Sequence, residues 1–550
     1  MACWRRSSVR LNEVTIGEFK NLCNLTVVFD DASPYTVLVG ENGAGKSNLI
    51  EALTLIFRNL DLEEPAPFDY SLKYRCGGSD ISIDATQGRS PRFWVRQAND
   101  APYRELSKKS FMSEDENGRP IYRPAFVFGY YSGPSDRLAS LYEKHRERFY
   151  SWIIRPPERR GRKDIGDPND LRRLFYAQTL HGQFVLLAFF MEPTTGPQDD
   201  RTFLREHLQI DGLDSVLFVM NRPPWGGARR GGDRRFWNAE GEVRQFLDRL
   251  YDAAMLPARM DRRVTQDLTK SVSVESLYLF LPDSDALEEV YRSYGDQYSF
   301  FTALESTHLS KLLGEVRTRV RMTQGGGGGE VTYRDLSEGE QQLLLVLGLL
   351  KFTARDEALF LLDEPDTHLN PVWSTQYLGF LDRFIRMRER QDTCHIVMSS
   401  HDPLVFAGLR REQVRILRRD ADGRAVVDVP DQDPRGMGVA AILTSDLFRL
   451  RSTLDPQTQA DLDRQRALAM QKHRTPDENE ELRQLNLFLR GKGLTQATRD
   501  PLYERFIRAW TEREDPAWAE VVELTPDQLD ERNRLAAEIV EQLRREEADA

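Results

Sequence analysis

The chain has 550 residues, of which 40% are hydrophobic and 30% are charged. This length exceeds the size at which one hydrophobic core stops growing, so we expect two or more lobes. The 76 basic and 87 acidic residues give a formal net charge of -11. That balance excludes an overall basic, nucleic-acid-binding surface but allows a local basic face.

No apolar run reaches the length that crosses a bilayer, and the N-terminal segment lacks the apolar stretch of a secretory signal. The cysteines Cys3, Cys23, Cys76 and Cys394 form no C-x-x-C pair, which argues against a disulfide framework or a zinc site. We therefore expect a cytoplasmic protein that makes no membrane contact.

The first expected elements are two strands within residues 11–30, joined by a turn at 17–24. A third strand at Tyr35–Gly40 runs into a glycine-rich loop, and the apolar spacing from Asn48 to Ile56 then predicts a helix. A strand, a glycine loop and a helix in this order are typical of a phosphate-binding unit.

The loop itself meets the pattern G-x-x-x-x-G-K-[ST]. Its glycines let backbone N–H groups curl around phosphates, Lys46 reaches the β- and γ-phosphates, and the Ser47 hydroxyl binds Mg²⁺. Only 12 of the 76 basic residues are lysines, so a lysine kept at this position points to function. The residues that we assign to nucleotide binding here are Gly40, Asn42, Gly43, Gly45, Lys46, Ser47 and Asn48.

The middle of the chain predicts strands at 81–83, 93–95 and 125–131, and helices at 171–190, 242–256, 286–292 and 306–317. It also contains three basic runs, at Arg155–Lys163, Arg229–Arg235 and Arg317–Arg321, and the glycine run Gly325–Gly329, which we interpret as a hinge or a disordered segment. The basic runs are consistent with DNA contact through phosphates and equally with ordinary solvated charge.

The apolar run that starts at Ala358 ends in two carboxylates, Asp363 and Glu364. Such a run predicts a buried parallel strand, and ligands bind at the carboxyl end of such strands. At that position Asp363 would hold Mg²⁺ through water, and Glu364 would orient and polarise the attacking water.

Two further segments flank this strand in the sequence. Upstream, Ser337 and Gly339 stand at the start of an apolar helix, where they could bind an anion. Downstream, a second buried strand begins at His395 and delivers His401 to the edge of the sheet.

In this order, the four segments resemble the ABC-type ATPase superfamily, and the glycine loop resembles its SMC- and RecF-like branch of AAA-family ATPases. The resemblance matches Gly40–Ser47 to Walker A, Leu336–Gln342 to the signature motif, Leu359–Glu364 to Walker B, Asp366–Pro371 to the D-loop and His401 to the switch histidine. It implies an α/β head with a P-loop, a mostly parallel sheet and an antiparallel β-subdomain. ATP and Mg²⁺ are the implied cofactors, and Glu364, His401 and Lys46 are the implied catalytic residues.

The resemblance further implies that two heads sandwich two ATP molecules, with Ser337 of one head contacting the γ-phosphate held by the other. The chain would then assemble with itself, as a head-to-head dimer or a higher oligomer, and would hydrolyse ATP slowly when alone. No glutamine matches the Q-loop convincingly: Gln87, Gln97 and Gln183 are candidates. The turn after strand 125–131 could instead supply Arg137 as a nucleotide sensor.

Leu336 lies 289 positions after Ser47, a much longer interval than transporter heads of this superfamily have. Without heptads or a C-x-x-C motif, the intervening residues do not predict a long coiled coil with a zinc hook. We expect four regions: 1–140, the first half of the head; 141–325, a mainly helical insertion lobe; 326–430, the second half of the head; and 431–550, a helical C-terminal extension.

The extension carries helix-spaced apolar residues at Gly438–Met470, Leu482–Leu489 and Leu535–Leu543, which would either dock a partner or pack onto the chain's own core. The first of these segments, with Tyr130–Arg137, is similar to bacterial anti-phage defence ATPases of the Septu type (PtuA-like). That resemblance implies a separate HNH-type nuclease chain as partner.

Two alternatives stay open. One is a RecF-like DNA-binding ATPase of recombination or repair. The other is an OLD-like nuclease with an unrecognised site, although Asp420-Ala-Asp is a weak match to the Asp-x-Asp that such a nuclease needs.

Overall fold

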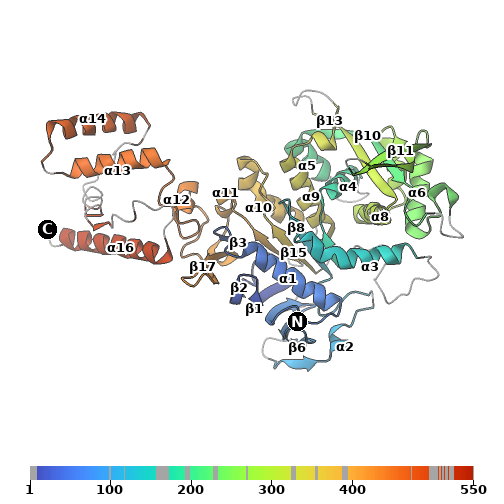
Figure 1. Ribbon diagram of the computed structural model, residues 1–550, viewed down its shortest axis with the longest axis horizontal. Coiled ribbons are helices and arrows are strands. Elements are labelled where there is room, and N and C mark those ends of the chain that lie inside the picture. The colour runs from blue at the N-terminus through green and yellow to red at the C-terminus, as the bar shows by residue number, and fades with distance from the viewer. Residues whose placement is uncertain are drawn as a thin grey trace, which may run out of the picture. The chain divides into compact units, whose positions relative to one another are not determined.

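A computed structural model gives the architecture, which divides into two compact units (Figure 1). Unit 1 comprises 1–405 and 412–428, and unit 2 comprises 406–411 and 429–550. The residues that the structure describes are 9–97, 101–116, 118–155, 172–191, 199–226, 233–267, 270–323, 330–353, 357–386, 394–471, 473–492, 494, 506, 509–510, 513–514, 518 and 525–548. The predicted basic run Arg155–Lys163, except Arg155, most of Arg229–Arg235, the glycine run Gly325–Gly329 and Cys3 lie outside these residues.

The centre of unit 1 is a sheet with the strand order β18-β17-β3-β16-β15-β8-β9, in which neighbours are parallel except β17 and β18. Long apolar runs form its inner strands, so that every residue of β15 and β16 is buried. The strands are β3 (Tyr35–Gly40), β8 (Phe126–Tyr131), β9 (Leu174–Tyr176), β15 (Ala358–Asp363), β16 (Cys394–Ser399), β17 (Val414–Arg419) and β18 (Ala425–Asp428).

A second, antiparallel sheet has the order β2-β1-β4-β5-β6-β7. Its strands are β1 (Arg10–Phe19), β2 (Leu22–Val28), β4 (Tyr70–Cys76), β5 (Ser79–Ala85), β6 (Arg92–Arg96) and β7 (Arg104–Leu106). Helix α1 (Lys46–Asp61) packs between the two sheets, in contact with β1 on one side and with β15 and β16 on the other (Figure 1). The structure therefore confirms the expected head, with a mostly parallel sheet and an antiparallel subdomain.

The insertion lobe contains helices, as expected, but also a five-stranded antiparallel sheet with the order β11-β12-β10-β13-β14. Its helices are α3 (Glu143–Ile153), α4 (Thr179–Phe190), α5 (Asp199–Leu208), α6 (Gly241–Ala253), α7 (Ser284–Tyr291) and α8 (Gln297–Leu309). Its strands are β10 (Ile210–Asn221), β11 (Ala258–Asp267), β12 (Lys270–Leu281), β13 (Leu313–Met322) and β14 (Glu330–Thr332).

The predicted helix at 306–317 is wrong at its C-terminal end, because α8 ends at Leu309 and β13 begins at Leu313. Along β13 the β-branched residues Val316, Thr318 and Val320 are buried, while Arg317, Arg319 and Arg321 are exposed. A period of two with β-branched residues favours a strand over a helix. The predicted helix at 171–190 likewise starts late, because β9 occupies its first part.

Helix α4 is apolar on all sides, and every residue from His181 to Phe190 is buried. It packs against α8 and against α9 (Glu338–Thr353), the helix that follows the signature motif. α9 in turn contacts α10 (Pro371–Arg386), which follows Walker B. The insertion lobe is thus joined to the second half of the head through one continuous helical core.

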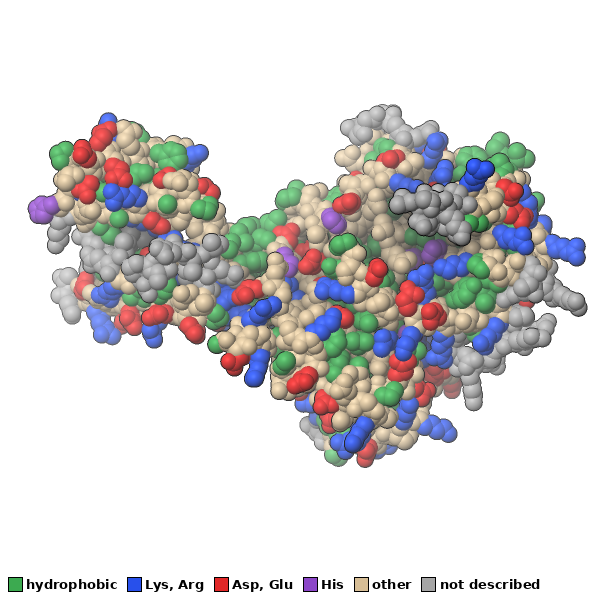
Figure 2. Space-filling model, viewed as in Figure 1, with side chains coloured by type: hydrophobic (Ala, Val, Ile, Leu, Met, Phe, Trp, Pro, Cys, Tyr) green, Lys and Arg blue, Asp and Glu red, His purple; other side chains and the backbone are tan. Residues whose placement is uncertain are grey.

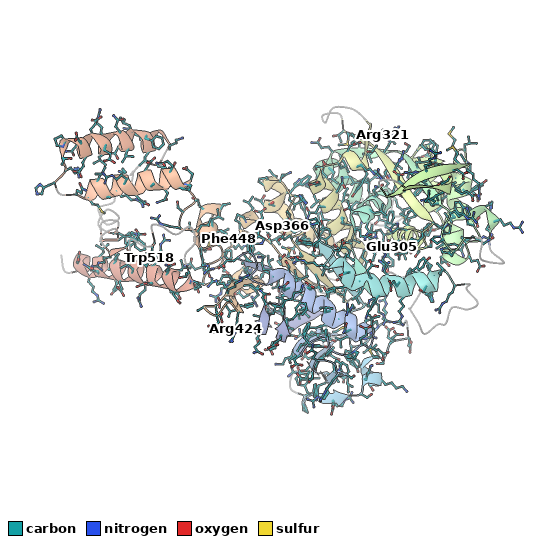
Figure 3. The ribbon with its side chains drawn as sticks, viewed as in Figure 1. Glu305, Arg321, Asp366, Arg424, Phe448 and Trp518 are labelled. Atoms are coloured by element: carbon teal, nitrogen blue, oxygen red, sulfur yellow. The ribbon has the colours of Figure 1, made fainter. Side chains whose placement is uncertain are left out.

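Unit 2 consists mainly of α12 (Val439–Thr444), α13 (Pro456–Met470), α14 (Pro476–Gly491) and α16 (Pro526–Ala548). The predicted helix across Gly438–Met470 is interrupted, because Asp455 caps a new helix at Pro456 by accepting the Thr458 N–H. Within the unit, α13 packs on α14, Phe406 lies against Phe448 with ring centroids 5.7 Å apart, and Trp518 lies beside Leu529 (Figure 3).

Among the described residues, no helix is long and apolar enough to cross a bilayer. Cys23, Cys76 and Cys394 are free thiols.

The C-terminal end of α1 is fixed by a buried charge cluster around Asp61. Its carboxylate accepts hydrogen bonds from Arg123 (2.7 Å), His145 (2.9 Å) and Arg173 (3.3 Å). Arg123 precedes β8, His145 lies on α3, and Arg173 precedes β9. Burial alone would raise the pKa of Asp61, but the His145 hydrogen bond and the charges of Arg173 and Arg123 hold it well below its usual range. The cluster therefore needs an ionised Asp61.

Replacing Asp61 by Asn should lower the free energy of unfolding by about 3–5 kcal/mol at neutral pH, because it leaves Arg123 buried without its carboxylate. A depressed pKa in the folded state gives its full stabilisation above the unfolded value of about 4 and loses it progressively as the pH falls from there to the folded value, so the difference from the wild type should shrink over that range. Urea unfolding at several pH values measures both effects.

The matched control is Glu64→Gln, which breaks the more exposed Lys144–Glu64 pair and should cost under about 1 kcal/mol. Equal losses in the two variants at neutral pH would contradict the assigned role of Asp61.

Candidate functional site

The predicted Walker A and Walker B residues and His401 meet at the carboxyl ends of β3, β15 and β16. The register of the parallel strands aligns Tyr131 of β8 with Asp363 of β15, and Asp363 with Ser399 of β16. The glycine loop after β3 closes over the same edge before α1 begins at Lys46. Two segments more than three hundred positions apart in the sequence therefore form one site.

The loop follows a path that requires glycine. Gly40 and Gly45 have φ values of 144° and 113°, in the region that L residues rarely adopt. At Gly40 a Cβ atom would also lie 1.9 Å from the carbonyl oxygen of Leu417 on the neighbouring strand β17. Gly40 is therefore required for two reasons: its backbone conformation, and the close approach of β17.

Lys46 is buried at the start of α1, with 5% of its surface exposed. Its ammonium group donates to the carbonyl oxygens of Gly40 (2.7 Å) and Glu41 (3.1 Å). These two bonds hold the ammonium group against the start of the loop. Burial lowers the pKa of Lys46 to about 8, although Glu364, Asp363 and Glu41 act in the opposite direction. An anion bound in the loop would stabilise the charged form.

Asp363 is the polar centre of the site. Its Oδ1 accepts hydrogen bonds from the hydroxyls of Ser47 (3.0 Å) and Ser399 (2.6 Å), and its Oδ2 accepts one from Arg137 (2.8 Å). The Arg137 guanidinium also stacks on the Tyr131 ring, with 4.8 Å between the guanidinium carbon and the ring centroid. The turn after β8, which we had singled out as the Q-loop candidate, therefore supplies an arginine to this carboxylate.

Glu364 follows in an uncommon backbone conformation, with φ of 54°. Its N–H donates to the Ser399 hydroxyl at 3.0 Å, which secures this conformation. Its carboxylate lies 3.7 Å from Nε2 of His401. Burial and the charge of Lys46 lower the pKa of His401, although Asp363 acts in the opposite direction, so the neutral imidazole is favoured at this place.

The D-loop starts beside this pair. Asp366, labelled in Figure 3, is 4% exposed and accepts a hydrogen bond from the Ser400 hydroxyl. Burial raises its pKa to about 7.

The signature residues Ser337 and Gly339 stand at the N-terminus of α9. Ser337 is exposed, and both its N–H and its hydroxyl donate to Glu340 Oε2 at 2.7 Å, while Glu340 N–H donates back to the hydroxyl at 3.3 Å. This reciprocal arrangement is a capping box. Gly339 is buried under the carbonyl of His368, where a Cβ would lie 2.4 Å from the oxygen.

Among the residues assigned to nucleotide binding, Asn42 and Gly43 are exposed. Asn48 donates to Asn21 at 2.6 Å, and Asn21 in turn donates to the Gly43 carbonyl at 2.9 Å. Asn48 thus contacts the turn between β1 and β2 and acts on the loop indirectly.

Sequence reasoning missed three residues that shape the site: Asn21, Arg419 and Ser399. Arg419 donates to the Gly43 carbonyl at 2.8 Å from the end of β17. No local motif marks Asn21 or Arg419, since only the strand order places them beside the loop. Ser399 could have been found, because it occupies the position of β16 that pairs with Asp363.

None of the three glutamine candidates for the Q-loop contacts the residues around Asp363 described above. Gln87 donates to Pro67 O at 3.3 Å in the antiparallel subdomain, Gln97 follows β6, and Gln183 is buried within α4.

Two protein-family models match the chain. The model described as "AAA ATPase domain" matches residues 10–110, and that described as "AAA domain, putative AbiEii toxin, Type IV TA system" matches residues 140–407. Among characterised proteins, Septu protein PtuA of Bacillus mycoides (strain KBAB4) is 26% identical over 127 residues. That stretch spans 22% of this chain and 17% of the relative, so the chain matches well under two thirds of the relative's length.

Among solved structures, the chain matches the Smc head domain bound to the C-terminal domain of ScpA, derived from Pyrococcus furiosus, with 11% identity, a TM-score of 0.30, and coverage of 76% of this chain and 96% of that chain. The recombination mediator protein RecF with ATP has 13% identity, a TM-score of 0.26, and coverage of 77% and 99%. The chain is therefore similar to AAA-type ATPases over the residues that these two models match, and over a shorter stretch it is similar to the Septu protein PtuA.

Proposed function

We propose that the chain binds and hydrolyses ATP with Mg²⁺, that ATP joins two chains head to head, and that this assembly controls a separate HNH-type nuclease in bacterial defence against phages. One observation supports the enzymatic part of this proposal: Ser47 of the phosphate loop donates to Asp363, and Glu364 and His401 lie beside them. Phosphoryl transfer needs little more from a protein than this positioning and charge stabilisation.

The oxygens around Asp363 fit Mg²⁺. Ser47 Oγ and Asp363 Oδ1 are hard donors 3.0 Å apart, and this ion commonly uses one or two protein oxygens together with water and phosphate oxygens. Ser47 and Asp363 would hold the ion, which would supply positive charge to neutralise the negative charge that develops during hydrolysis.

The side chains around it would perform three tasks. Lys46 would exchange its two loop carbonyls for β- and γ-phosphate oxygens. Glu364 would accept a hydrogen bond from the attacking water and orient it towards the γ-phosphorus. His401 would hold that carboxylate in place across the 3.7 Å that separates them and contact the γ-phosphate.

Assembly of two heads is supported by the exposure of Ser337. The hydroxyl and N–H of Ser337 lie at the positive end of α9, and they would serve a γ-phosphate held by the other chain. A lone head would lack these donors and would turn over slowly.

The nuclease partner and the defence role rest on the similarity to Septu protein PtuA and on unit 2. Two of its helices present apolar side chains to solvent: Leu487 and Phe488 on α14 are 58% and 45% exposed, and Val540 on α16 is 40% exposed. We propose these side chains as a docking face for the nuclease or for a further copy of the chain.

DNA contact remains a second candidate because of β13. Arg317, Arg319 and Arg321 are exposed on one face of this strand, although Arg317 pairs with Glu315 at 2.9 Å. Lys and Arg side chains are frequent over the insertion lobe on the face shown in Figure 2, with acidic side chains among them.

Glu364→Gln should reduce ATP turnover by about two orders of magnitude or more, because the amide cannot accept the proton of the attacking water. ATP binding should remain, so the variant should accumulate as an ATP-bound dimer that light scattering detects. Glu13→Gln, on the exposed face of β1, is the control and should leave both unchanged. A Glu364→Gln chain that hydrolyses ATP as fast as the wild type would remove Glu364 from the mechanism.

The lowered pKa of Lys46, about 8, predicts a pH-dependent affinity for ATP. Phosphates favour the charged ammonium, so binding above this pH requires proton uptake, and the affinity should fall by up to about tenfold per pH unit above 8. Calorimetric titrations at several pH values measure this slope. In Lys46→Arg the side chain stays charged, so the slope should disappear; an equal slope in that variant would assign the effect to another group.

Arg137 occupies the Asp363 oxygen that is not bonded to the serines, and it would compete there with a metal ion. Arg137→Gln should therefore lower the Mg²⁺ concentration that gives half-maximal ATP binding by about threefold to tenfold, as expected for the loss of one charge-assisted hydrogen bond. Fluorescent nucleotide titrations at varied Mg²⁺ measure this, with Arg92→Gln on β6 as the control. An unchanged or higher Mg²⁺ requirement would contradict the competition.

A further inference from the structure

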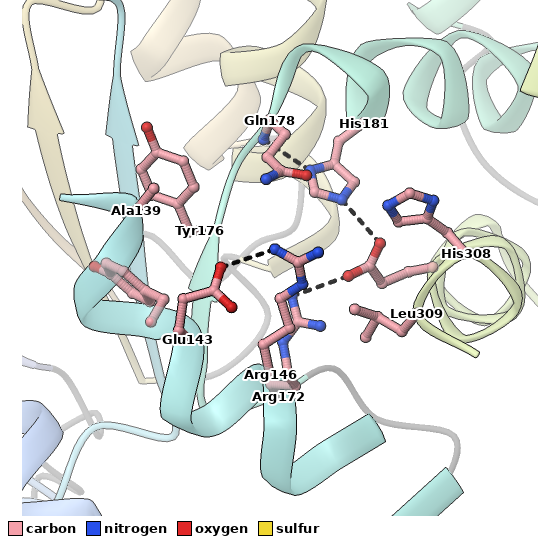
Figure 4. A pocket seen from close by; sticks show the side chains of 11 residues that line it. Ala139, Glu143, Arg146, Arg172, Tyr176, Gln178, His181, His308 and Leu309 are labelled. Atoms are coloured by element: carbon pink, nitrogen blue, oxygen red, sulfur yellow. Dashed lines mark hydrogen bonds and ion pairs between the residues drawn. The ribbon is translucent and has the colours of Figure 1, made fainter. Parts of the chain in front are cut away.

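The insertion lobe contains a cavity of about 350 Å³, counting the space open to solvent (Figure 4). Five elements contribute to its wall: the 3₁₀ helix η1 (Ala139–Tyr142), α3, β9, α4 and α8. The motifs of the ATPase site do not include any of the lining residues.

Charged side chains are buried at the inner end of this cavity. Glu305 of α8 accepts hydrogen bonds from Arg172 at 2.9 Å and from His181 at 2.8 Å, and each of these residues is at most 8% exposed. Burial would raise the pKa of Glu305, but His181 and Arg172 lower it to about 2. Glu305 is therefore ionised and compensates the charge of Arg172.

Two polar atoms at this inner end lack a hydrogen-bond partner among the described residues. They are Nη1 of Arg172 and Nδ1 of His308, both fully enclosed by the protein. A buried donor of a charged group, such as the Arg172 guanidinium, is rarely left unsatisfied, because it loses the hydrogen bonds that water would provide. Burial lowers the pKa of His308 to about 4, so its imidazole is neutral, and Nδ1 donates or accepts according to the tautomer. Both residues line the cavity, but the two atoms expose almost no surface, so a group inside it would satisfy them only after a small rotation of the side chains.

A second arginine stands at the outer part of the wall. Arg146 pairs with Glu143 at 2.9 Å on α3, and their side chains are 29% and 49% exposed. An exposed pair of this kind contributes little to stability, so Glu143 can turn into solvent at small cost. The charge of Arg172 is neutralised by Glu305. Once Glu143 has turned away, the positive charge that attracts an anion would come from Arg146.

We propose that this cavity binds a small oxyanion of phosphate size, held between the Nη1 atom of Arg172 and the guanidinium of Arg146. The oxygens of such an anion are arranged as a tetrahedron and accept several hydrogen bonds at once. Two guanidinium groups that approach from different directions therefore match an oxyanion better than they match a single water molecule.

The position of the cavity gives this site a path to the ATPase. Ala139 and Tyr142, which line it, belong to η1, and η1 begins two residues after Arg137. Tyr142 also packs on β8, where a Cβ at Gly129 would lie 2.2 Å from its hydroxyl oxygen. An anion that orders η1 would therefore restrain the segment that carries Arg137 to Asp363.

The test measures the binding of inorganic phosphate to the full chain by calorimetry and by equilibrium dialysis. The Lys46→Ala chain serves as the background, because it weakens phosphate binding in the loop after β3. In this background we expect one phosphate site to remain. Arg146→Gln should weaken it about tenfold, and Leu309→Phe, which fills the cavity, should abolish it.

Glu143→Gln should tighten phosphate binding several-fold, because it removes the carboxylate that competes for Arg146. A purely structural role of Arg146 and Glu143 would not produce opposite effects on phosphate affinity. Arg148→Gln, on the same helix but outside the cavity wall, is the matched control and should leave the affinity unchanged.

The absence of phosphate binding in the Lys46→Ala chain would overturn the proposal and leave the cavity to water. Phosphate binding that is equal in the Arg146→Gln, Glu143→Gln and Arg148→Gln chains would also overturn it. Since Arg146 and Glu143 are partly exposed, these two variants remain informative if Leu309→Phe fails to fold.

Discussion

One buried carboxylate, Asp363, connects the two halves of the ATPase unit. It is 2% exposed and receives hydrogen bonds from Ser47, Ser399 and Arg137, which come from three different segments. A carboxylate at this depth is costly unless such partners are present, so the order and register of the parallel strands must deliver all of them. Ser47 is 316 positions away in the sequence. The site therefore exists only when the core sheet has formed from both halves.

The insertion lobe begins at this same point. The chain leaves β8 beside Asp363, passes through Arg137 and η1, and enters α3 before it builds the lobe. It returns through α9, whose N-terminus carries Ser337 and whose body packs on α4. Both ends of the insertion thus carry a residue of the proposed ATP site. A change in the packing of the lobe would reach the nucleotide through either of two segments, the one that carries Arg137 and the one that carries Ser337. The cavity lies beside the first segment.

The sequence was informative where a pattern is local. The phosphate loop needs its glycines within eight residues, and the buried strands at Ala358 and Cys394 are continuous apolar runs, so both could be located without a structure. The contacts of Asn21 and Arg419 with Gly43 depend on which strands become neighbours, and no local signal encodes that order. The first part of β13 was misassigned to a helix because Leu309, Leu312, Leu313 and Val316 follow the i, i+3, i+4, i+7 spacing of a helix, and the alternation typical of a strand becomes clear only beyond Val316.

The capping box at α9 bears on how two heads would assemble. In the single chain the Glu340 carboxylate takes both donors of Ser337, the N–H and the hydroxyl. In the proposed dimer a γ-phosphate from the other chain would need those same donors at the same positive helix end. Two anions then compete for one position, and the exchange favours the phosphate because it carries more charge and more acceptor oxygens. A nucleotide without the γ-phosphate offers no such exchange, so Glu340 would keep the signature motif closed in the ADP-bound chain and restrict assembly to ATP.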